Sequence, residues 1–257
     1  MDRKTKSLRE RALDHFAALR IPLAPEELDR VLAAAENEGL SALEVLDRLL
    51  GEQAARRLER SIKRRIDDAR FAEHKTLETF DWNFNRTIRR DQYEQLATAE
   101  FVRRHINVVL VGQSGVGKSH LMQAVGLSAC SFGHRVLYTT SAQMLLQLTA
   151  ALADKSLTET LKYYAKWDLL LVDEFGFDRI EREDSPQAAH LLYKVVHSRH
   201  QKRSTILITN VDFDAWAAYL GDAPLAMAML DRLVDGAIII KIKGPSYRAR
   251  RSAKPKD

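Results

Sequence analysis

The 257-residue sequence has little of several features that would assign a protein to a class at once. Its single cysteine, Cys130, excludes an intramolecular disulfide framework and cannot by itself supply a thiolate cage for a metal ion. No apolar run approaches the roughly 18 residues of a membrane-spanning helix, and the N-terminal stretch MDRKTKSLRER contains no apolar signal core. From these absences we expect a soluble protein in a reducing cytoplasm, with no membrane partner.

Sequence patterns of several enzyme classes are missing as well. No Gly-x-Ser-x-Gly elbow occurs, so nothing indicates a Ser–His–Asp hydrolase. His190, His197 and His200 lie close together in the sequence and could suggest metal ligands. No second cluster and no cysteine pair accompanies them, so surface histidines are the simpler interpretation.

The distribution of charge indicates which class of partner to expect. The sequence has 40 Lys and Arg residues against 35 Asp and Glu residues, a net charge of +5 that is compatible with a polyanionic partner but does not demonstrate one. Residues 56–65 (RRLERSIKRR) hold six basic residues and one acidic residue, and residues 241–257 hold seven and one. These two segments are the first candidates for contacts with phosphate groups.

The sequence changes character near residue 75, and before that point its pattern is helical throughout. Pro25 suits the first turn of a helix that Gly39 ends, and Ser41 with Glu44 forms a capping box for the next helix. Gly51 is expected to separate that helix from a highly charged one. We therefore predict a small all-helical domain over residues 1–74, whose charge-rich helices present solvated polar faces.

Residues 75–257 are predicted to form a second domain, which starts with an aromatic-rich connector and ends with a basic tail. Phe80, Trp82 and Phe84 of the connector could stack on a base, although aromatic residues in a linker more often pack it onto a domain. Beyond it, apolar runs alternate with helical stretches. Strands are expected at 107–111, 135–139, 169–172, 205–209 and 237–242, with helices at 118–132, 141–152, 157–164, 185–201 and 226–233. This alternation predicts the α/β class, with a parallel sheet covered by helices on both faces.

The strongest motif is GQSGVGKS at residues 112–119, which fits the phosphate-binding loop pattern and lies between a predicted strand and a predicted helix. Its glycines let the backbone turn its N–H groups toward phosphate oxygens. Lys118 would reach the β- and γ-phosphates and Ser119 would bind Mg²⁺. A chance glycine-rich turn is the alternative, and the strand and helix on either side argue against it. The candidate ATP-binding residues are Gly112, Gln113, Ser114, Gly115, Val116, Gly117, Lys118, Ser119 and His120.

The second motif is LLLVDEFGF at residues 169–177, where an apolar strand runs into two carboxylates. Asp173 would hold Mg²⁺, directly or through water, and Glu174 would position and polarise the attacking water. Alone, the motif could be an ordinary solvated strand end. It follows Lys118 by 55 residues with one strand between, as a nucleotide-hydrolysing core requires.

Two further residues complete the predicted catalytic set of Lys118, Glu174, Asn210 and Arg232. Asn210 ends the strand TILITN and could hydrogen-bond the attacking water or the γ-phosphate, or belong to an ordinary turn. Arg232 in LDRLVDG could neutralise γ-phosphate charge in a neighbouring subunit, or it could be a surface arginine paired with Asp231 or Asp235. The sequence does not separate these alternatives.

Several strings occur together in the order of one family: KTLETFDW, NVVLVGQSGVGKSHLMQAVG, LLLVDEFGF, STILITN with FDAW, DRLVDG and GPSYRAR. Over about residues 75–250 the chain resembles the IstB-type transposition helpers, which are AAA+ ATPases, and more distantly the DnaC-type helicase loaders. The resemblance implies Walker A at residues 112–119, Walker B at Asp173 and Glu174, sensor 1 at Asn210 and an arginine finger at Arg232. It also implies ATP-driven oligomerisation on duplex DNA, ATP sites at subunit interfaces, and a cognate transposase as partner.

The segment after the last predicted strand departs from AAA+ proteins at large. Fifteen residues follow Ile242, too few for a full helical lid, so the lid is expected to be reduced or absent and Arg248 is a weak stand-in for a sensor-2 arginine. With this resemblance, the N-terminal helices over residues 1–74 are expected to serve DNA contact or self-association, with DNA contacts at Arg57, Arg60, Lys63 and Arg64.

Three other functions remain open on the sequence alone. A loader of a replicative helicase would use the same ATPase with a different partner. A small-molecule P-loop kinase would need a substrate lid after the loop, and none is evident. A structural DNA-binding protein would use ATP only as a ligand.

Overall fold

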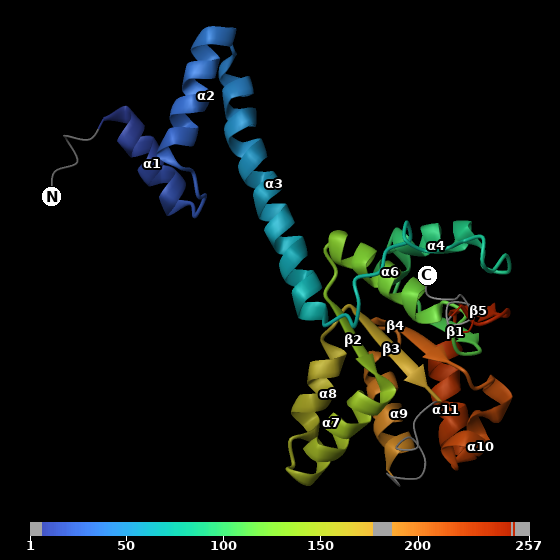
Figure 1. Cartoon of the computed structure of the whole chain (residues 1–257). Coiled ribbons are helices and arrows are strands. Elements are labelled where there is room, and N and C mark those ends of the chain that lie inside the picture. Colours follow the sequence, from blue (N-terminus) through green and yellow to red (C-terminus); the bar gives the residue numbers. More distant parts are fainter. Residues whose placement is uncertain (1–6, 177–186, 248, 250–257) are drawn as a thin grey trace. The chain divides into compact units, whose positions relative to one another are not determined.

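The computed structural model describes residues 7–176, 187–247 and 249, which fall into two compact units that divide between Lys63 and Arg64. The first unit contains α1 (Leu8–Ala18), α2 (Pro25–Glu38) and the first part of α3 (Ala42–Ala69) (Figure 1). The sequence placed the division later, near residue 75. The last turns of α3 belong to the second unit because Ala69 is buried in its core and Ile66 packs against that core.

Local signals in the first unit act as the sequence predicts. Pro25 occupies the first turn of α2, and Gly39 ends that helix with a φ of 66°. The Ser41 N–H donates to Glu44 Oε2 at 2.7 Å and the Glu44 N–H donates to Ser41 Oγ at 3.4 Å, so the capping box is confirmed. A small core forms from Leu28, Val31 and Leu49, with Leu13, Leu23 and Val45 packed against it.

The predicted break at Gly51 is wrong, because α3 runs through this residue without interruption. Glycine in a helix costs about 1 kcal/mol relative to alanine, which tertiary contacts can offset. The buried Leu49 lies on one side of Gly51, and on the other the buried Gln53 donates from Nε2 to Glu27 Oε1 at 3.1 Å. These contacts with α2 hold both flanks of the glycine in one helix.

The second unit is a parallel five-stranded sheet in the order β2-β3-β4-β1-β5, as the sequence predicts for the fold class. Its strands are β1 (Val108–Gly112), β2 (Val136–Thr140), β3 (Leu169–Phe175), β4 (Ser204–Thr209) and β5 (Ile238–Ile242). Its remaining helices are α4 (Arg90–Ala97), α5 (Glu100–Arg103), α6 (Lys118–Ser131), α7 (Ser141–Ala153), α8 (Leu157–Ala165), α9 (Ala188–Arg199), η2 (Phe213–Ala215), α10 (Trp216–Leu220) and α11 (Ala223–Val234). All five predicted strands are confirmed, whereas α4, α5, η2 and α10 were not predicted.

Alternate residues of β2, β3 and β4 serve two separate cores. Leu169 and Leu171 of β3 pack with α4 and α6 on one face, whereas Leu170 and Val172 pack with the helices on the other face. Figure 1 shows α4 and α6 on one side of the sheet and α7 to α11 on the other. A strand buried on both faces must be apolar, which is why β3 begins with a continuous hydrophobic run in the sequence. In β5, by contrast, Ile239 and Lys241 are exposed.

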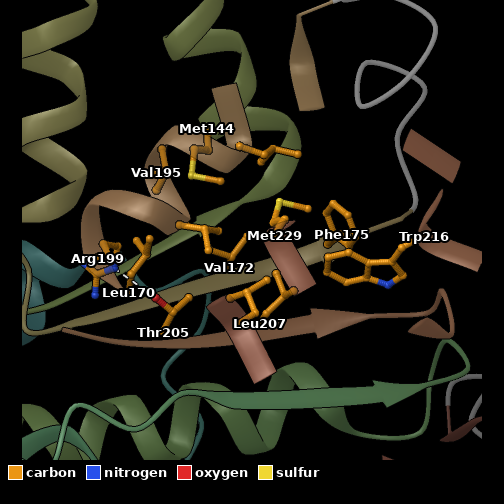
Figure 2. A pocket seen from close by; sticks show the side chains of 13 residues that line it. Met144, Leu170, Val172, Phe175, Val195, Arg199, Thr205, Leu207, Trp216 and Met229 are labelled. Carbon is orange, nitrogen blue, oxygen red and sulfur yellow. Dashed lines mark hydrogen bonds between the residues drawn. The ribbon is translucent and has the colours of Figure 1, made fainter. Parts of the chain in front are cut away.

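The second core contains a small apolar cavity and one buried charge, both drawn in Figure 2. The cavity, of about 30 Å³, is lined by side chains of β3, β4, α7, α9 and α11 and by Trp216. Arg199 is buried at the end of α9 and donates to the backbone oxygens of Tyr164, Trp167 and Ser204 and to Thr205 Oγ1. These bonds tie the end of α9 to the end of α8 and to the start of β4.

Among the described residues, no helix is both long and apolar enough to cross a membrane. The carboxyl ends of β1, β3 and β4 meet at one edge of the sheet, the edge where open α/β sheets bind ligands.

Candidate active site

The predicted phosphate-binding loop connects β1 to α6, and two of its glycines have left-handed backbone conformations. The φ angle is 82° at Gly115 and 100° at Gly117. A Cβ at Gly115 would lie 2.1 Å from Ser246 Oγ, and one at Gly117 would lie 2.8 Å from the Phe80 ring. Glycine is therefore required at both positions by backbone conformation and by space.

Lys118 is the first residue of α6, and its side chain holds the loop closed. Its Nζ donates to the backbone oxygens of Gly112 at 2.6 Å and of Gln113 at 2.7 Å. The N-terminus of α6 has no side-chain cap among the described residues. Its first backbone N–H groups and the ammonium group of Lys118 together suit an anion such as a phosphate group.

The two carboxylates at the end of β3 differ in exposure because the strand is irregular there. The pairing register with β4 shifts between Val172 and Phe175, and Glu174 has a φ of 61°. Asp173 is buried, at 2% exposed, whereas Glu174 is exposed. A non-glycine residue with positive φ at the predicted catalytic carboxylate is the kind of backbone strain that collects at functional sites.

Two donors orient the Asp173 carboxylate. The Tyr138 O–H of β2 donates to Oδ2 at 3.2 Å, and the Glu174 N–H donates to Oδ1 at 2.8 Å. Burial of Tyr138, together with the negative charge of Asp173, raises the pKa of the phenol, so Tyr138 remains a hydrogen-bond donor at neutral pH. Tyr138 was not singled out from the sequence, because nothing in a strand sequence shows which carboxylate lies beside it.

Most of the predicted ATP-binding and metal-binding residues line one cavity of about 510 Å³. They are Ser114, Gly115, Val116, Gly117, Lys118, Ser119, His120 and Asp173, and the predicted catalytic residue Glu174 lines the same cavity. Gly112 and Gln113 do not line the cavity, but both accept hydrogen bonds from Lys118. The volume is within the range of small-molecule and cofactor sites.

The connector before β1 forms part of the wall of this cavity. Phe80 and Phe84 line it, and Phe80 also packs against the core below. Phe80 stands edge-on to the His120 ring at 5.1 Å between centroids, and His120 Nε2 lies 2.9 Å from the Thr76 backbone oxygen. Trp82 packs against the core and does not line the cavity. Of the two roles that the sequence left as alternatives, packing of the connector onto the domain is therefore confirmed.

Tyr247 is a cavity residue that was not singled out from the sequence. Its ring meets Phe84 edge-on at 4.9 Å between centroids, and its N–H donates to the Gly115 backbone oxygen at 2.9 Å. Asn85 Nδ2 donates to the Lys243 backbone oxygen at 2.8 Å, which joins the connector to the segment after β5. The string GPSYRAR was the available signal, but Arg248 lies outside the described residues.

Asn210 follows β4 and lies close to the end of β3. Its Oδ1 is 2.4 Å from the position that a Cβ on Gly176 would occupy, so its amide lies against the backbone two residues after Glu174. Asn210 is exposed and is not among the residues that line the 510 Å³ cavity. It neighbours the carboxylate strand without reaching the cavity wall.

Arg232 does not line this cavity either, and its side chain contacts α9. Its Nε donates to His197 Nδ1 at 3.0 Å, and its guanidinium lies over the Tyr193 ring, 5.0 Å from the centroid. Within the described part of the chain it forms no ion pair with Asp231 or Asp235, the pairing that the sequence left as an alternative.

The basic residues proposed for DNA contact, Arg57, Arg60, Lys63 and Arg64, are exposed on α3. Arg57, Arg60 and Arg64 follow the spacing i, i+3, i+7, so they share one face of the helix. Their neighbour Arg56 pairs with Glu27 and Glu52, whereas none of the four takes part in an ion pair within the described residues.

The described part of the chain contains no group of three or more His, Cys, Asp or Glu side chains placed to hold a metal ion. His190, His197 and His200 belong to this part, and His197 is the contact of Arg232.

Known proteins resemble this chain over nearly its whole length. The family model described as IstB-like ATP binding protein matches residues 15–255. The ATP-binding protein of insertion sequence IS5376 from Geobacillus stearothermophilus is 31% identical over 243 residues, which cover 95% of this chain and 95% of that protein. The ATP-binding protein of insertion sequence IS21 from Pseudomonas aeruginosa is 35% identical over 227 residues, which cover 88% and 84%.

Solved structures share the fold at low sequence identity. The crystal structure of DnaI aligns with a TM-score of 0.55 and 21% identity, over 66% of this chain and 91% of that chain. The replication initiator DnaA bound to AMPPCP and single-stranded DNA aligns with a TM-score of 0.54 and 18% identity, over 68% and 52%. At these identities the likeness shows the fold alone.

Proposed function

The chain belongs to the family of IstB-like ATP-binding proteins, and from that premise we propose that it is a Mg²⁺-dependent ATPase that assembles on duplex DNA and assists a transposase. The observation that carries the proposal is the single cavity that holds the loop residues Lys118 and Ser119 together with Asp173 and Glu174. A phosphate-binding loop without an activating carboxylate would suffice for binding. The exposed Glu174 beside it supports hydrolysis.

In this proposal the loop binds the phosphates and Ser119 with Asp173 holds Mg²⁺. The hydroxyl and carboxylate oxygens of these residues line the same cavity and are the hard donors that Mg²⁺ prefers. The carboxylate of Asp173 accepts from Tyr138 and Glu174, which leaves lone pairs on both oxygens for the ion or its waters. When bound, Mg²⁺ neutralises charge on the β- and γ-phosphates.

Glu174 is the residue that would activate water. Its carboxylate accepts a proton from the attacking water as the water oxygen bonds to the γ-phosphorus, and the β–γ bridging oxygen leaves with ADP. Lys118 would move from its bonds with Gly112 and Gln113 to the departing phosphate oxygens. The products are ADP and inorganic phosphate.

Glu174→Gln tests hydrolysis, because the amide keeps the size of the side chain but cannot take the proton. We expect turnover to fall at least about 100-fold while a fluorescent ATP analogue still binds. Glu159→Gln, an exposed position on α8, is the matched control and should retain full turnover. Unchanged turnover in Glu174→Gln would show that this chain uses ATP in some other way.

Arg232 is proposed to act in a neighbouring subunit, because it does not line the cavity of its own chain. An arginine that reaches the γ-phosphate across an interface can raise turnover by about 10³-fold or more. The complete site would then exist only in the oligomer. Sizing with duplex DNA and a non-hydrolysable ATP analogue tests this, since a persistent monomer would contradict an interfacial site.

Binding of DNA is proposed to use Arg57, Arg60, Lys63 and Arg64, which no carboxylate neutralises within the described residues. Four phosphate contacts give a slope of about −3.5 for log affinity against log salt concentration. Replacing all four by alanine should flatten that slope and weaken binding to different sequences alike. A slope that stays unchanged would place the contacts elsewhere.

The proposed partner is the transposase of the same insertion sequence, to which this protein would offer chosen target DNA. Relatives at 31% and 35% identity bear the names of insertion-sequence proteins, whereas the likeness to the DnaC helicase loader, at 20% identity, is one of fold. The test is the neighbouring reading frame: an integrase-type transposase whose strand transfer this protein stimulates would support the proposal. If the protein instead loads a helicase, a helicase-loading function would replace this proposal.

A further inference from the structure

Arg232 is held by two uncharged rings of α9. Tyr193 lies beneath the guanidinium at 5.0 Å, and His197 Nδ1 accepts the Nε–H at 3.0 Å. The two rings stack on each other, with 5.6 Å between centroids and 16° between planes. The Tyr193 ring fixes the plane of the guanidinium, and the hydrogen bond to His197 fixes the direction of the Nε–H bond.

The hydrogen bond also defines the form of His197. Nδ1 can accept the hydrogen bond from Arg232 Nε only if Nδ1 carries no hydrogen, so His197 must be neutral with its hydrogen on Nε2. His200 has the other tautomer or is charged, because its Nδ1 lies 3.1 Å from the Arg232 backbone oxygen, which can only accept. The end of α11 is thereby attached to α9 at the side chain and at the backbone.

These contacts leave the charge of Arg232 available. No carboxylate pairs with it among the described residues, and Asp235 lies toward His200 instead, with 3.9 Å from its Oδ2 to Nε2. The Nη1 group donates to the Ala228 backbone oxygen at 2.8 Å, and no hydrogen bond in the described part of the chain uses Nη2. A partly exposed arginine on a helix with acidic neighbours would ordinarily point toward one of them.

Contacts in the core hold α9 and α11 in place. Val195 of α9 and Met229 of α11 point into the same apolar core, where Figure 2 shows them together, and the hydrogen bonds of Arg199 fix the last turn of α9. Tyr193 and His197 are therefore presented by a backbone that the core holds in place, with His197 exposed at the surface.

We propose that Tyr193 and His197 are positioning residues that hold Arg232 with its Nη2 edge free to bind the γ-phosphate in the neighbouring subunit. The inference rests on the proposed role of Arg232 and adds the residues that orient it. Two uncharged rings suit this task, because a carboxylate partner would neutralise the positive charge of Arg232 that has to attract the γ-phosphate. Holding the guanidinium in one orientation before assembly also removes the need to order a long side chain in each catalytic cycle.

The test uses two pairs of variants in the DNA-assembled, ATP-hydrolysing protein. Tyr193→Ala and His197→Ala remove the ring and the acceptor, and each should lower kcat roughly fivefold or more. Tyr193→Phe keeps the ring face, and His197→Asn places Oδ1 at the same number of bonds from Cα as Nδ1, so both should stay close to wild-type kcat. KM for ATP should not change in any of the four, because the loop of the same chain binds the nucleotide.

Arg232→Ala is measured beside them and separates the role of the arginine from the role of the rings. If Arg232→Ala is inactive while Tyr193→Ala and His197→Ala turn over like wild type, the positioning role of the two rings is refuted. The proposed role of Arg232 is then retained. If Arg232→Ala itself retains full turnover, the proposed role of Arg232 is refuted, and the positioning role of Tyr193 and His197 is refuted with it. Loss of kcat in Tyr193→Phe and His197→Asn equal to that in the alanine variants would also overturn the inference, since a generally weakened helix pair would explain it.

Discussion

Replacing Arg199 by methionine removes four hydrogen bonds from the interior of the second unit and keeps much of the side-chain volume. The guanidinium is buried, at 1% exposed, and all of its acceptors are uncharged oxygens: three backbone carbonyls and the Thr205 hydroxyl. Burial, together with the positive charge of Arg203, lowers the pKa of Arg199 to about 9, although the group remains protonated at neutral pH. The arginine thus stays in place only because its hydrogen bonds offset the loss of water.

Two effects oppose each other in this variant. Each buried acceptor that loses its donor costs about 1–3 kcal/mol, so the four acceptors together give a total on the order of 4–12 kcal/mol. Removing an unpaired buried charge returns part of that cost. We expect a net loss of about 3 kcal/mol, equivalent to a fall in Tm of roughly 10 °C for a unit of this size.

Urea unfolding followed by circular dichroism measures the change directly. Arg104→Met is the matched control, because Arg104 is exposed and forms no ion pair among the described residues, so its effect should stay within about 0.5 kcal/mol. A loss in Arg199→Met no larger than that of the control would refute the idea that these bonds anchor α9.

Three further predictions follow from the site and the core. Tyr138→Phe removes a donor from Asp173 and should raise the Mg²⁺ concentration for half-maximal turnover about tenfold; an unchanged Mg²⁺ titration would contradict this. Gly117→Ala forces a side chain into a left-handed conformation, with its Cβ 2.8 Å from Phe80, and should weaken binding of a fluorescent ATP analogue at least about tenfold; an unchanged Kd would show that the loop adapts freely. Burial raises the pKa of the Cys130 thiol to about 12, so the folded protein should not react with a thiol reagent at about pH 8 until urea unfolds it; fast labelling without denaturant would contradict the buried position.

The strands β1, β3 and β4 were predictable because they are buried on both faces and therefore mostly apolar. Leu169 to Val172 supplies both cores, so every position of that run is hydrophobic. The order of the strands was not predictable in the same way, because it depends on which edges pair in space. The short helices α5 and α10 escaped notice since four or five residues are too few to show a helical period.

Where the site depends on a few adjacent residues, the sequence motifs alone were sufficient to predict it. The loop at residues 112–119 and the pair Asp173 and Glu174 could be placed at one sheet edge from the alternation of strands and helices alone. Contacts between distant segments could not: Tyr247 meets Gly115 across more than 100 residues, and Tyr138 reaches Asp173 from the next strand. The sequence likewise left open whether Arg232 pairs with Asp231 or Asp235, and its contacts with Tyr193 and His197 are visible only in three dimensions.

The central claim is that one subunit's cavity is completed by Arg232 of its neighbour, and mixing two inactive variants tests it most directly. Arg232→Ala keeps an intact cavity, and Glu174→Gln keeps an intact Arg232. In an equal mixture assembled on DNA, about a quarter of the head-to-tail interfaces join an unmutated cavity to an unmutated Arg232. We predict that ATP turnover reappears in the mixture at about that fraction of wild type, whereas a mixture as inactive as its two components would contradict the claim.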